Sequence, residues 1–248
     1  AMTINAERIK LQTTRSPIWL ILTVAVVGLG FAAIQAAALG PHGVLKPERA
    51  AIGVSVFGVP VLMILSAMSI TGEYRSGMIR TTFLATPNRA WALAAKALVM
   101  AALSAVVTAV MVAGSIAFAA SLVTAEQAEE LSFSNAEVWR AIGAMSLYAV
   151  LGAVLAVGLG GLLRHAAAVV AVVLLMPFVV EPVLGALPQV GARVGPWLPF
   201  GNAYTFTKTP WFQTFSLWWG PVGAACYFAA VAAVVFLLAL VVVTRRDP

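Results

Sequence analysis

Long apolar runs separated by short polar segments fill the chain from end to end. Each run reaches the roughly 20 residues that a helix needs to cross the hydrocarbon core of a membrane. The pattern therefore predicts an all-α integral membrane protein in which residues 1–248 form a single transmembrane domain. The six predicted membrane-spanning helices cover residues 18–39, 51–71, 92–123, 141–163, 166–187 and 220–243.

Composition supports this interpretation and argues against several kinds of function. Hydrophobic residues make up 62% of the 248 residues and charged residues 10%, whereas a soluble domain carries about 25% charged residues. Nine acidic residues and two histidines leave little from which to build a metal site or a general acid–base pair. No G-x-x-x-x-G-K-[ST] phosphate loop occurs, so we expect neither catalytic residues nor a P-loop nucleotide site. Cys226 lies in an apolar run and is predicted to be a buried, inert thiol.

Basic residues lie at the ends of the apolar runs, where they indicate membrane orientation rather than binding to nucleic acid. If the N-terminus is cytoplasmic, ten of the 15 Lys and Arg residues fall on the cytoplasmic side. Because cytoplasmic loops are enriched in these residues, both termini are predicted to be cytoplasmic. The ten residues are Arg8, Lys10, Arg15, Arg75, Arg80, Arg89, Lys96, Arg164, Arg245 and Arg246.

Three connecting segments have a readable local pattern. Residues 1–17 are polar and basic with a weak apolar stripe, which is typical of an interfacial helix or of a frayed basic tail. Thr124 and Gln127 have capping-box spacing, which predicts a short helix ahead of a fourth span that begins near Asn135. The segment 188–215 is apolar but broken by prolines, which predicts short re-entrant or interfacial helices.

The segment from Gly72 to Arg89, GEYRSGMIRTTFLATPNR, is the most informative one. Ser76 is a candidate cap for a short helix that ends before Thr86, since the following proline disfavours helical geometry there. On such a helix Ile79 and Phe83 share one face. A short cytoplasmic helix with an apolar knob suits docking into a groove of a partner. An ordinary positive-inside loop is the alternative.

The same segment resembles the cytoplasmic loop of type 2 ATP-binding-cassette (ABC) export permeases. The closest likeness is to the small six-span bacterial subunits associated with antibiotic and sodium export. Met78 stands where that family usually has threonine, but the surrounding frame is intact. The resemblance rests on Glu73-Tyr74-Arg75-Ser76-Gly77, Ile79-Arg80, Leu84-Ala85-Thr86-Pro87 and Arg89, supported by Glu7-x-x-Lys10-Leu11 and Trp197-Leu198-Pro199-Phe200-Gly201.

This resemblance implies a permease subunit in a bacterial plasma membrane, working as a homodimer or as a heterodimer with a related permease. Two separate ATPase subunits would bind ATP and Mg²⁺, so this chain would need no cofactor of its own. Residues 1–17 would lie beside the ATPase, 72–90 would be the coupling loop, and 188–215 would form an extracellular gate. The implied coupling residues are Glu73, Tyr74, Arg75, Ser76, Gly77, Ile79, Arg80 and Phe83.

Few ionisable residues fall inside the predicted spans, which favours an external energy source and an apolar or amphipathic cargo. Glu181, beside Pro182 near the outer end of the fifth span, is either a gate or cargo residue or a hydrated interfacial one. Lys96 is expected to extend its side chain to the lipid headgroups. Other candidates for a gate or cargo path are Pro199, Phe200, Phe57 and Met63. A non-transporting scaffold subunit and an ion-coupled carrier remain alternatives.

Overall fold

The computed structural model describes residues 7, 9, 16–40, 42–85, 88–211 and 216–245, and it includes no side-chain description for Ser16, Arg80, Phe83 and Ala85. Within these ranges the fold is all-α, with six helices long and apolar enough to cross a membrane. The predicted spans are thus confirmed in number and position. Most of the predicted N-terminal interfacial segment, 1–17, lies outside the described residues. The spans are Pro17–Ala37, Val54–Ser76, Arg89–Leu122, Ala136–Leu163, Ala166–Ala186 and Pro221–Arg245.

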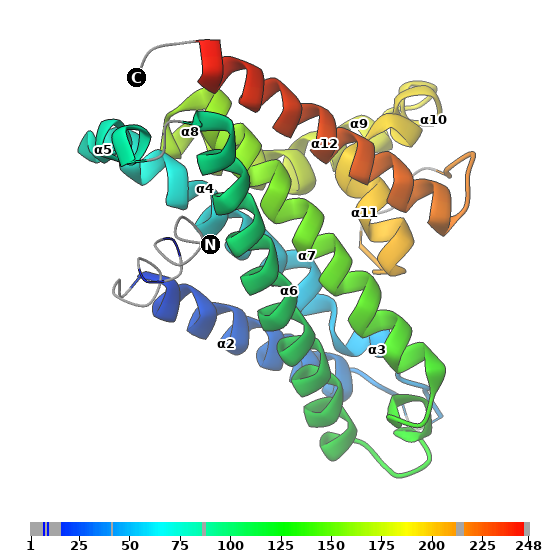
Figure 1. Cartoon of the computed structure of the whole chain (residues 1–248). Coiled ribbons are helices and arrows are strands. Elements are labelled where there is room, and N and C mark those ends of the chain that lie inside the picture. Colours follow the sequence, from blue (N-terminus) through cyan, green and yellow to red (C-terminus); the bar gives the residue numbers. More distant parts are fainter. Residues whose placement is uncertain are drawn as a thin grey trace.

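The helix α7 (Ala136–Leu163) lies at the centre and packs against α4 (Val59–Ser76), α6 (Arg89–Leu122) and α12 (Pro221–Arg245), as Figure 1 shows. Glycines on α7 allow its neighbours to approach closely: a Cβ at Gly160 would lie 2.6 Å from Ile70 Cγ2. Small residues at helix contacts are the usual means of close packing in lipid, where apolar surface alone gives little preference between helices.

The spans differ in how much of their surface the rest of the chain covers. The second span is mostly buried, whereas α2 (Ser16–Ala37), the fifth span and α12 expose broad apolar faces. Tryptophans lie exposed near the ends of several spans, as expected for an aromatic belt at the membrane interface. Cys226 is also exposed on α12, so the prediction of a buried thiol is wrong.

Two spans contain a π-helical segment, Val54–Gly58 (η1) before α4 and Met176–Val180 (η3) between α8 (Ala166–Leu175) and α9 (Glu181–Ala186). Pro60 and Pro182 each follow shortly after and cannot donate the backbone hydrogen bond that an α-helix needs, which favours a wider turn before them. Gly53, just before η1, is required by packing, because a Cβ there would lie 2.6 Å from Phe31 Cβ and 2.8 Å from the Val27 carbonyl oxygen.

The connection after α4 differs from the prediction in one respect. The hydroxyl of Ser76 donates to the Gly72 carbonyl at 2.9 Å, so Ser76 is the last residue of α4 rather than the cap of the next helix. Gly77 ends α4 with φ 71°, a left-handed conformation that glycine adopts without strain. The short helix α5 (Met78–Ala85) follows directly, and Thr86 and Pro87, where it was predicted to end, lie outside the described residues.

The connection between α6 and α7, at the other end of the bundle, forms the local structure that its sequence predicts. Thr124 and Gln127 form the reciprocal hydrogen bonds of a capping box, at 3.3 and 3.4 Å, although the helix that follows them is only a 3₁₀ turn, Glu129–Leu131 (η2). Asn135 caps α7 by accepting a hydrogen bond from the Glu137 N–H at 3.0 Å.

Short helices fill the predicted re-entrant segment, 188–215, of which residues 212–215 lie outside the described part. They are α10 (Val190–Val194), the 3₁₀ turn η4 (Gly195–Trp197) and α11 (Pro199–Thr207), and α11 packs against α12. One further short helix, α3 (Pro47–Ala50), precedes the second span. We call the end of the bundle with α5 and the last turn of α12 the α5 end, and the opposite end, with α3 and the α6–α7 connection, the α3 end (Figure 1).

Candidate functional site

The first part of the candidate site is the outward surface of α5. Leu84 is 83% exposed and Met78 49% exposed, with the exposed Thr81 between them on the same side of the helix. Ile79 is only 4% exposed and packs inward, so it is not the exposed apolar knob that the sequence suggested. Two large apolar side chains on a short helix at one end of the bundle form a compact exposed apolar surface, and such surfaces often mark interaction sites.

Two of the predicted coupling residues, Arg80 and Phe83, have side chains outside the described part of the chain. Phe83 comes four residues after Ile79 in the same helix. A role in coupling stays a prediction for Arg80 and for Phe83. Arg75, Ser76 and Gly77 are exposed around the turn between α4 and α5.

Glu73, by contrast, is buried inside the α5 end. One carboxylate oxygen accepts a hydrogen bond from Lys96 Nζ at 2.6 Å, and the other accepts one from the Thr82 hydroxyl at 3.1 Å. The same Lys96 ammonium bonds Glu7 at 2.7 Å. Lys96 is 2% exposed, so the expectation that it extends to the headgroups is wrong. Its charge is neutralised by two buried carboxylates instead, the arrangement that makes a buried charge tolerable.

Tyr74, the next residue, is held by a different contact. The guanidinium of Arg164 lies 5.0 Å from the centre of the Tyr74 ring, a cation–π geometry. Arg164 ends α7 in a left-handed conformation, between α7 and α8. The pair Glu73 and Tyr74 therefore fixes the end of α4 to α6 on one side and to α7 on the other.

The second part of the candidate site is α11, whose beginning is anchored by Glu181. This buried carboxylate accepts hydrogen bonds from the backbone N–H groups of Phe200 at 2.8 Å and Gly201 at 2.6 Å. A carboxylate at a helix N-terminus satisfies N–H groups that have no partner within the helix and complements the helix dipole. Burial, with a contribution from Glu181, raises the pKa of the nearby Tyr204 phenol above its ordinary value. Glu181 is thus paired within the protein rather than hydrated at an interface.

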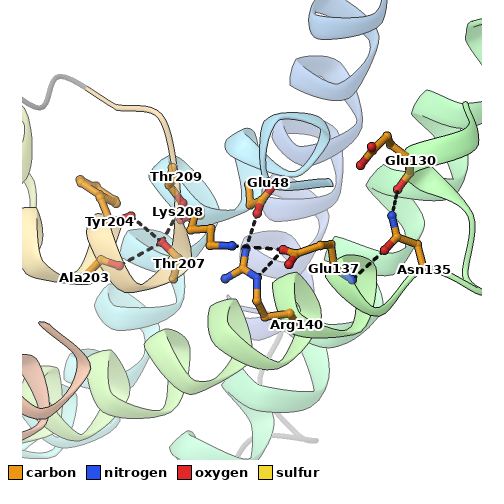
Figure 2. Close-up of polar contacts among 11 residues, drawn as sticks. Glu48, Glu130, Asn135, Glu137, Arg140, Ala203, Tyr204, Thr207, Lys208 and Thr209 are labelled. Atoms are coloured by element: carbon orange, nitrogen blue, oxygen red, sulfur yellow. Dashed lines mark hydrogen bonds and ion pairs between the residues drawn. The ribbon is translucent and has the colours of Figure 1, made fainter. Parts of the chain in front are cut away.

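The end of α11 is anchored by charges at the α3 end, which Figure 2 shows converging on Arg140. Arg140 pairs with the buried Glu48 of α3 and, at 2.7 Å, with Glu137, and Lys208 reaches Glu137 at 3.2 Å. Next to Lys208, the buried hydroxyl of Thr209 lies 2.8 Å from that of Ser55 in η1. Both ends of α11 are therefore held by other spans.

Between α11 and the first two spans lies an aromatic cluster formed by Phe31, Phe57, Phe178 and Trp211. Phe57 contacts the other three rings at centroid distances of 4.9, 5.4 and 5.6 Å. Both π-helical segments contribute to it, since Phe57 lies in η1 and Phe178 in η3. All four side chains are half-buried. Wide helical turns of this kind are frequent at functional sites.

The remaining path candidates lie elsewhere in the packing. Met63 is fully buried against α7, where a Cβ on Gly152 would lie 3.0 Å from Met63 Cγ. Phe200 is buried and Pro199 half-buried at the start of α11. A cargo role for these three residues stays a prediction.

Sequence reasoning identified Glu73, Glu181 and Phe57 but not the contacts they make. It assigned Lys96 to the headgroups rather than to Glu73, and it missed Arg164 and Arg140 as partners of Tyr74 and Glu48. The signal for Lys96 was its place inside an apolar run, and the signal for Arg140 was its spacing of three residues from Glu137 on one helix. Across the described residues, no group of three or more His, Cys, Asp or Glu side chains is placed to hold a metal ion.

Comparison with known proteins places this architecture in a family. The model of the family described as ABC-2 family transporter protein matches residues 3–181, which include the first four spans, most of the fifth span, α5 and Glu181. No curated protein matches the sequence. Six apolar helices able to span a membrane agree with this match. The chain therefore belongs to the ABC-2 family of transporter proteins and is a multi-pass membrane protein.

Proposed function

We propose that this chain is the permease subunit of an ATP-driven exporter in a bacterial plasma membrane. Two permease chains, identical or related, would stand on two cytoplasmic ABC ATPases that bind ATP and Mg²⁺. The complex would move an apolar or amphipathic cargo out of the cytoplasm. Membership of the ABC-2 family supports the association with ABC ATPases in general, while the cargo, the subunit number and the direction are the content of the proposal.

The distribution of charge supports the proposed orientation. Arg75, Arg89, Arg164 and Arg245 lie at the α5 end, whereas the exposed acidic residues of the α6–α7 connection lie at the α3 end. The positive-inside tendency therefore directs the α5 end to the cytoplasm, where an ATPase can reach it.

The observation that carries the proposal is the exposed apolar surface of α5, formed by Met78 and Leu84. Interfaces depend mainly on a few apolar or aromatic anchors that become buried, while charges at the rim steer the encounter. A groove on the ATPase that receives Leu84 would transmit its movement to α5 and, through the tight turn at Gly77, to α4.

The helix α4 then connects the two parts of the candidate site. Its 18 residues span about 27 Å at 1.5 Å per residue, and it continues directly from η1, which carries Phe57. Displacement of α5 by the ATPase would therefore move Phe57 against Phe31, Phe178 and Trp211. We propose that this aromatic cluster is the closed gate of the cargo path.

The lining of that proposed gate supports an apolar or amphipathic cargo. Aromatic rings offer apolar contact area, whereas the neighbouring hydroxyls of Ser55 and Thr209 are buried and hydrogen-bond each other. No acidic or basic side chain belongs to this cluster of described residues, which favours a cargo without a required charge over a coupled ion.

Co-purification with an ABC ATPase, sought first among the genes that neighbour this one, tests the proposal. Leu84→Asp should abolish retention of the ATPase, because it places a charge in an apolar contact. Leu122→Asp is the matched control, because Leu122 is also exposed, at 50%, but ends α6 at the α3 end. Equal retention for Leu84→Asp and wild type would contradict docking through α5. Transport that follows the proton gradient and ignores ATP would favour an ion-coupled carrier.

A further inference from the structure

The starting observation is the position of Lys96 in the α5 end. Its ammonium is buried and lies 2.7 Å from a Glu7 oxygen and 2.6 Å from a Glu73 oxygen. These carboxylates come from different parts of the chain: Glu7 precedes the first span, and Glu73 belongs to the last turn of α4. One ammonium therefore joins the N-terminal segment, α4 and α6.

The connection extends through Glu73 to α5, which we call the coupling helix because it is the helix proposed to receive the ATPase. While one oxygen of this carboxylate faces Lys96, the other accepts the hydrogen bond from Thr82 in the middle of α5. The carboxylate is 5% exposed. Charge-assisted hydrogen bonds of this kind are short, directional and stronger than those between neutral groups. Thr82, Glu73, Lys96 and Glu7 thus form a continuous chain of contacts from α5 to the N-terminal segment.

Stability alone gives a weak reason for this arrangement. Replacing a buried ion pair by apolar or neutral groups of similar size is often neutral or stabilising, whereas removing one partner is strongly unfavourable. A buried charge network is therefore better suited to fixing one relative position of several segments than to adding stability. Here the segments it fixes include the helix proposed to receive the ATPase.

We infer that Lys96 is a positioning residue that locks the N-terminal segment to the coupling helix, so that both respond together when the ATPase moves α5. The inference rests on the proposed function for the source of the movement. The lock itself, formed by Glu7, Lys96, Glu73 and Thr82, is a property of this chain alone. The N-terminal segment is thereby a second moving part of the coupling device rather than a passive membrane anchor.

The first test uses the full-length chain in lipid nanodiscs without the ATPase. Glu7→Gln should make amide hydrogen exchange in residues 78–85 about tenfold faster, although residue 7 is far from them in the sequence. Glu129→Gln, an exposed change at the α3 end, is the matched control and should leave that exchange unchanged. Wild-type exchange in 78–85 for Glu7→Gln would overturn the lock.

The second test adds the ATPase and compares exchange before and after ATP with vanadate. In wild type, protection should change both in residues 78–85 and in the peptide that contains Glu7. In the triple variant Glu7→Gln/Lys96→Met/Glu73→Gln, which removes every charge of the lock, the change should persist in 78–85 and disappear from the N-terminal peptide. The single variant Lys96→Arg keeps the cation and both carboxylates, so it should show the N-terminal response of wild type.

The two proposals fail in distinguishable ways. If nucleotide changes neither segment in wild type, the proposed function fails, and the first test still decides the lock. If the triple variant shows the wild-type response in both segments, the lock is overturned while coupling through α5 stands. A triple variant that loses its cooperative melting transition would also overturn the inference, because the charges would then serve the fold itself.

Discussion

At the scale of single residues, the buried charged side chains discussed above either form ion pairs or cap a helix, and each holds a particular element in place. Glu181 illustrates this best: both of its carboxylate oxygens are occupied by the N–H groups of Phe200 and Gly201. It therefore holds α11 in place, and any effect on the gate passes through the position of that helix. Lys96 and Glu73 play the corresponding part at the other end of the protein.

The anchoring role of Glu181 predicts a graded loss of stability. Glu181→Ala removes both acceptors and should lower the free energy of unfolding by roughly 1–3 kcal/mol. Glu181→Gln keeps one acceptor and should cost less. Thermal unfolding in detergent checks the order, and hydrogen exchange in residues 199–207 should accelerate in the same order. Glu130→Ala, an exposed change at the α3 end, serves as the control. Equal stability of Glu181→Ala and wild type would show that the cap contributes nothing.

The charges around Arg140 predict a contrast between two neighbouring positions. Arg140→Ala would leave the buried Glu48 without its ion pair, which should cost about 2 kcal/mol or more. Lys208 and Glu137 are each 47% exposed, so Lys208→Ala should cost less than about 1 kcal/mol. Thermal unfolding at low and high salt separates the two contributions, because salt weakens the exposed Lys208–Glu137 pair more than the buried contact of Glu48. A larger loss for Lys208→Ala than for Arg140→Ala would contradict the assignment of Glu48 as the partner that matters.

At the scale of helices, close approach depends on a few positions without a side chain. The first span and η1 meet at Gly53, where no Cβ fits between Phe31 and the Val27 carbonyl. This contact supports Phe31 and Phe57, whose rings lie 4.9 Å apart in the aromatic cluster. Packing between these two segments and the geometry of the proposed gate are therefore linked.

Gly53→Ala should accordingly separate α2 from η1 and cost about 1–3 kcal/mol, the range for overpacking in a tight contact. Gly30→Ala is the matched control, since Gly30 lies within α2 and a methyl group there would have no other atom within 4 Å. It should be neutral or slightly stabilising because alanine favours the helix. The melting temperatures of the two purified variants test this difference in stability. Similar values for both would mean that the Gly53 contact is not tight.

At the scale of the whole molecule, the sequence was sufficient for the membrane spans and insufficient for the contacts between them. Apolar runs of the required length predict spans directly, and the capping pattern at Thr124 and the turn at Gly77 depend on neighbouring residues. Lys96 and Glu7, by contrast, lie 89 positions apart, and Glu181 lies 19 positions before Phe200. Their pairing depends on how the spans pack, which no local pattern encodes.

The same packing explains why the predicted outward face of α5 was wrong at Ile79. Apolar spacing along a short helix shows that one face is apolar, but not whether that face meets the protein or a partner. The chain covers Ile79 and leaves Met78 and Leu84 exposed. Only the position of α5 against the rest of the bundle shows which of its apolar side chains are buried in the chain and which are exposed.

The orientation of the whole chain gives a further prediction. In a Cys226→Ala background, a cysteine at the exposed Ser76 of the α5 end should be protected from an impermeant thiol reagent in intact cells. A cysteine at the exposed Glu126 of the α3 end should react. Both should react after the cells are opened, which controls for accessibility. Labelling of Ser76→Cys but not of Glu126→Cys in intact cells would reverse the orientation.

The most direct test of the central claim, that α5 docks into an ABC ATPase, is photo-crosslinking from Leu84. A photoreactive amino acid at this position should form a covalent adduct with the ATPase subunit in membranes from cells that express both proteins. The same amino acid at Leu122, equally apolar but at the α3 end, should form none. An ATPase adduct from Leu84 alone is the result that the account predicts; no adduct from Leu84, in a complex that still co-purifies, would contradict it.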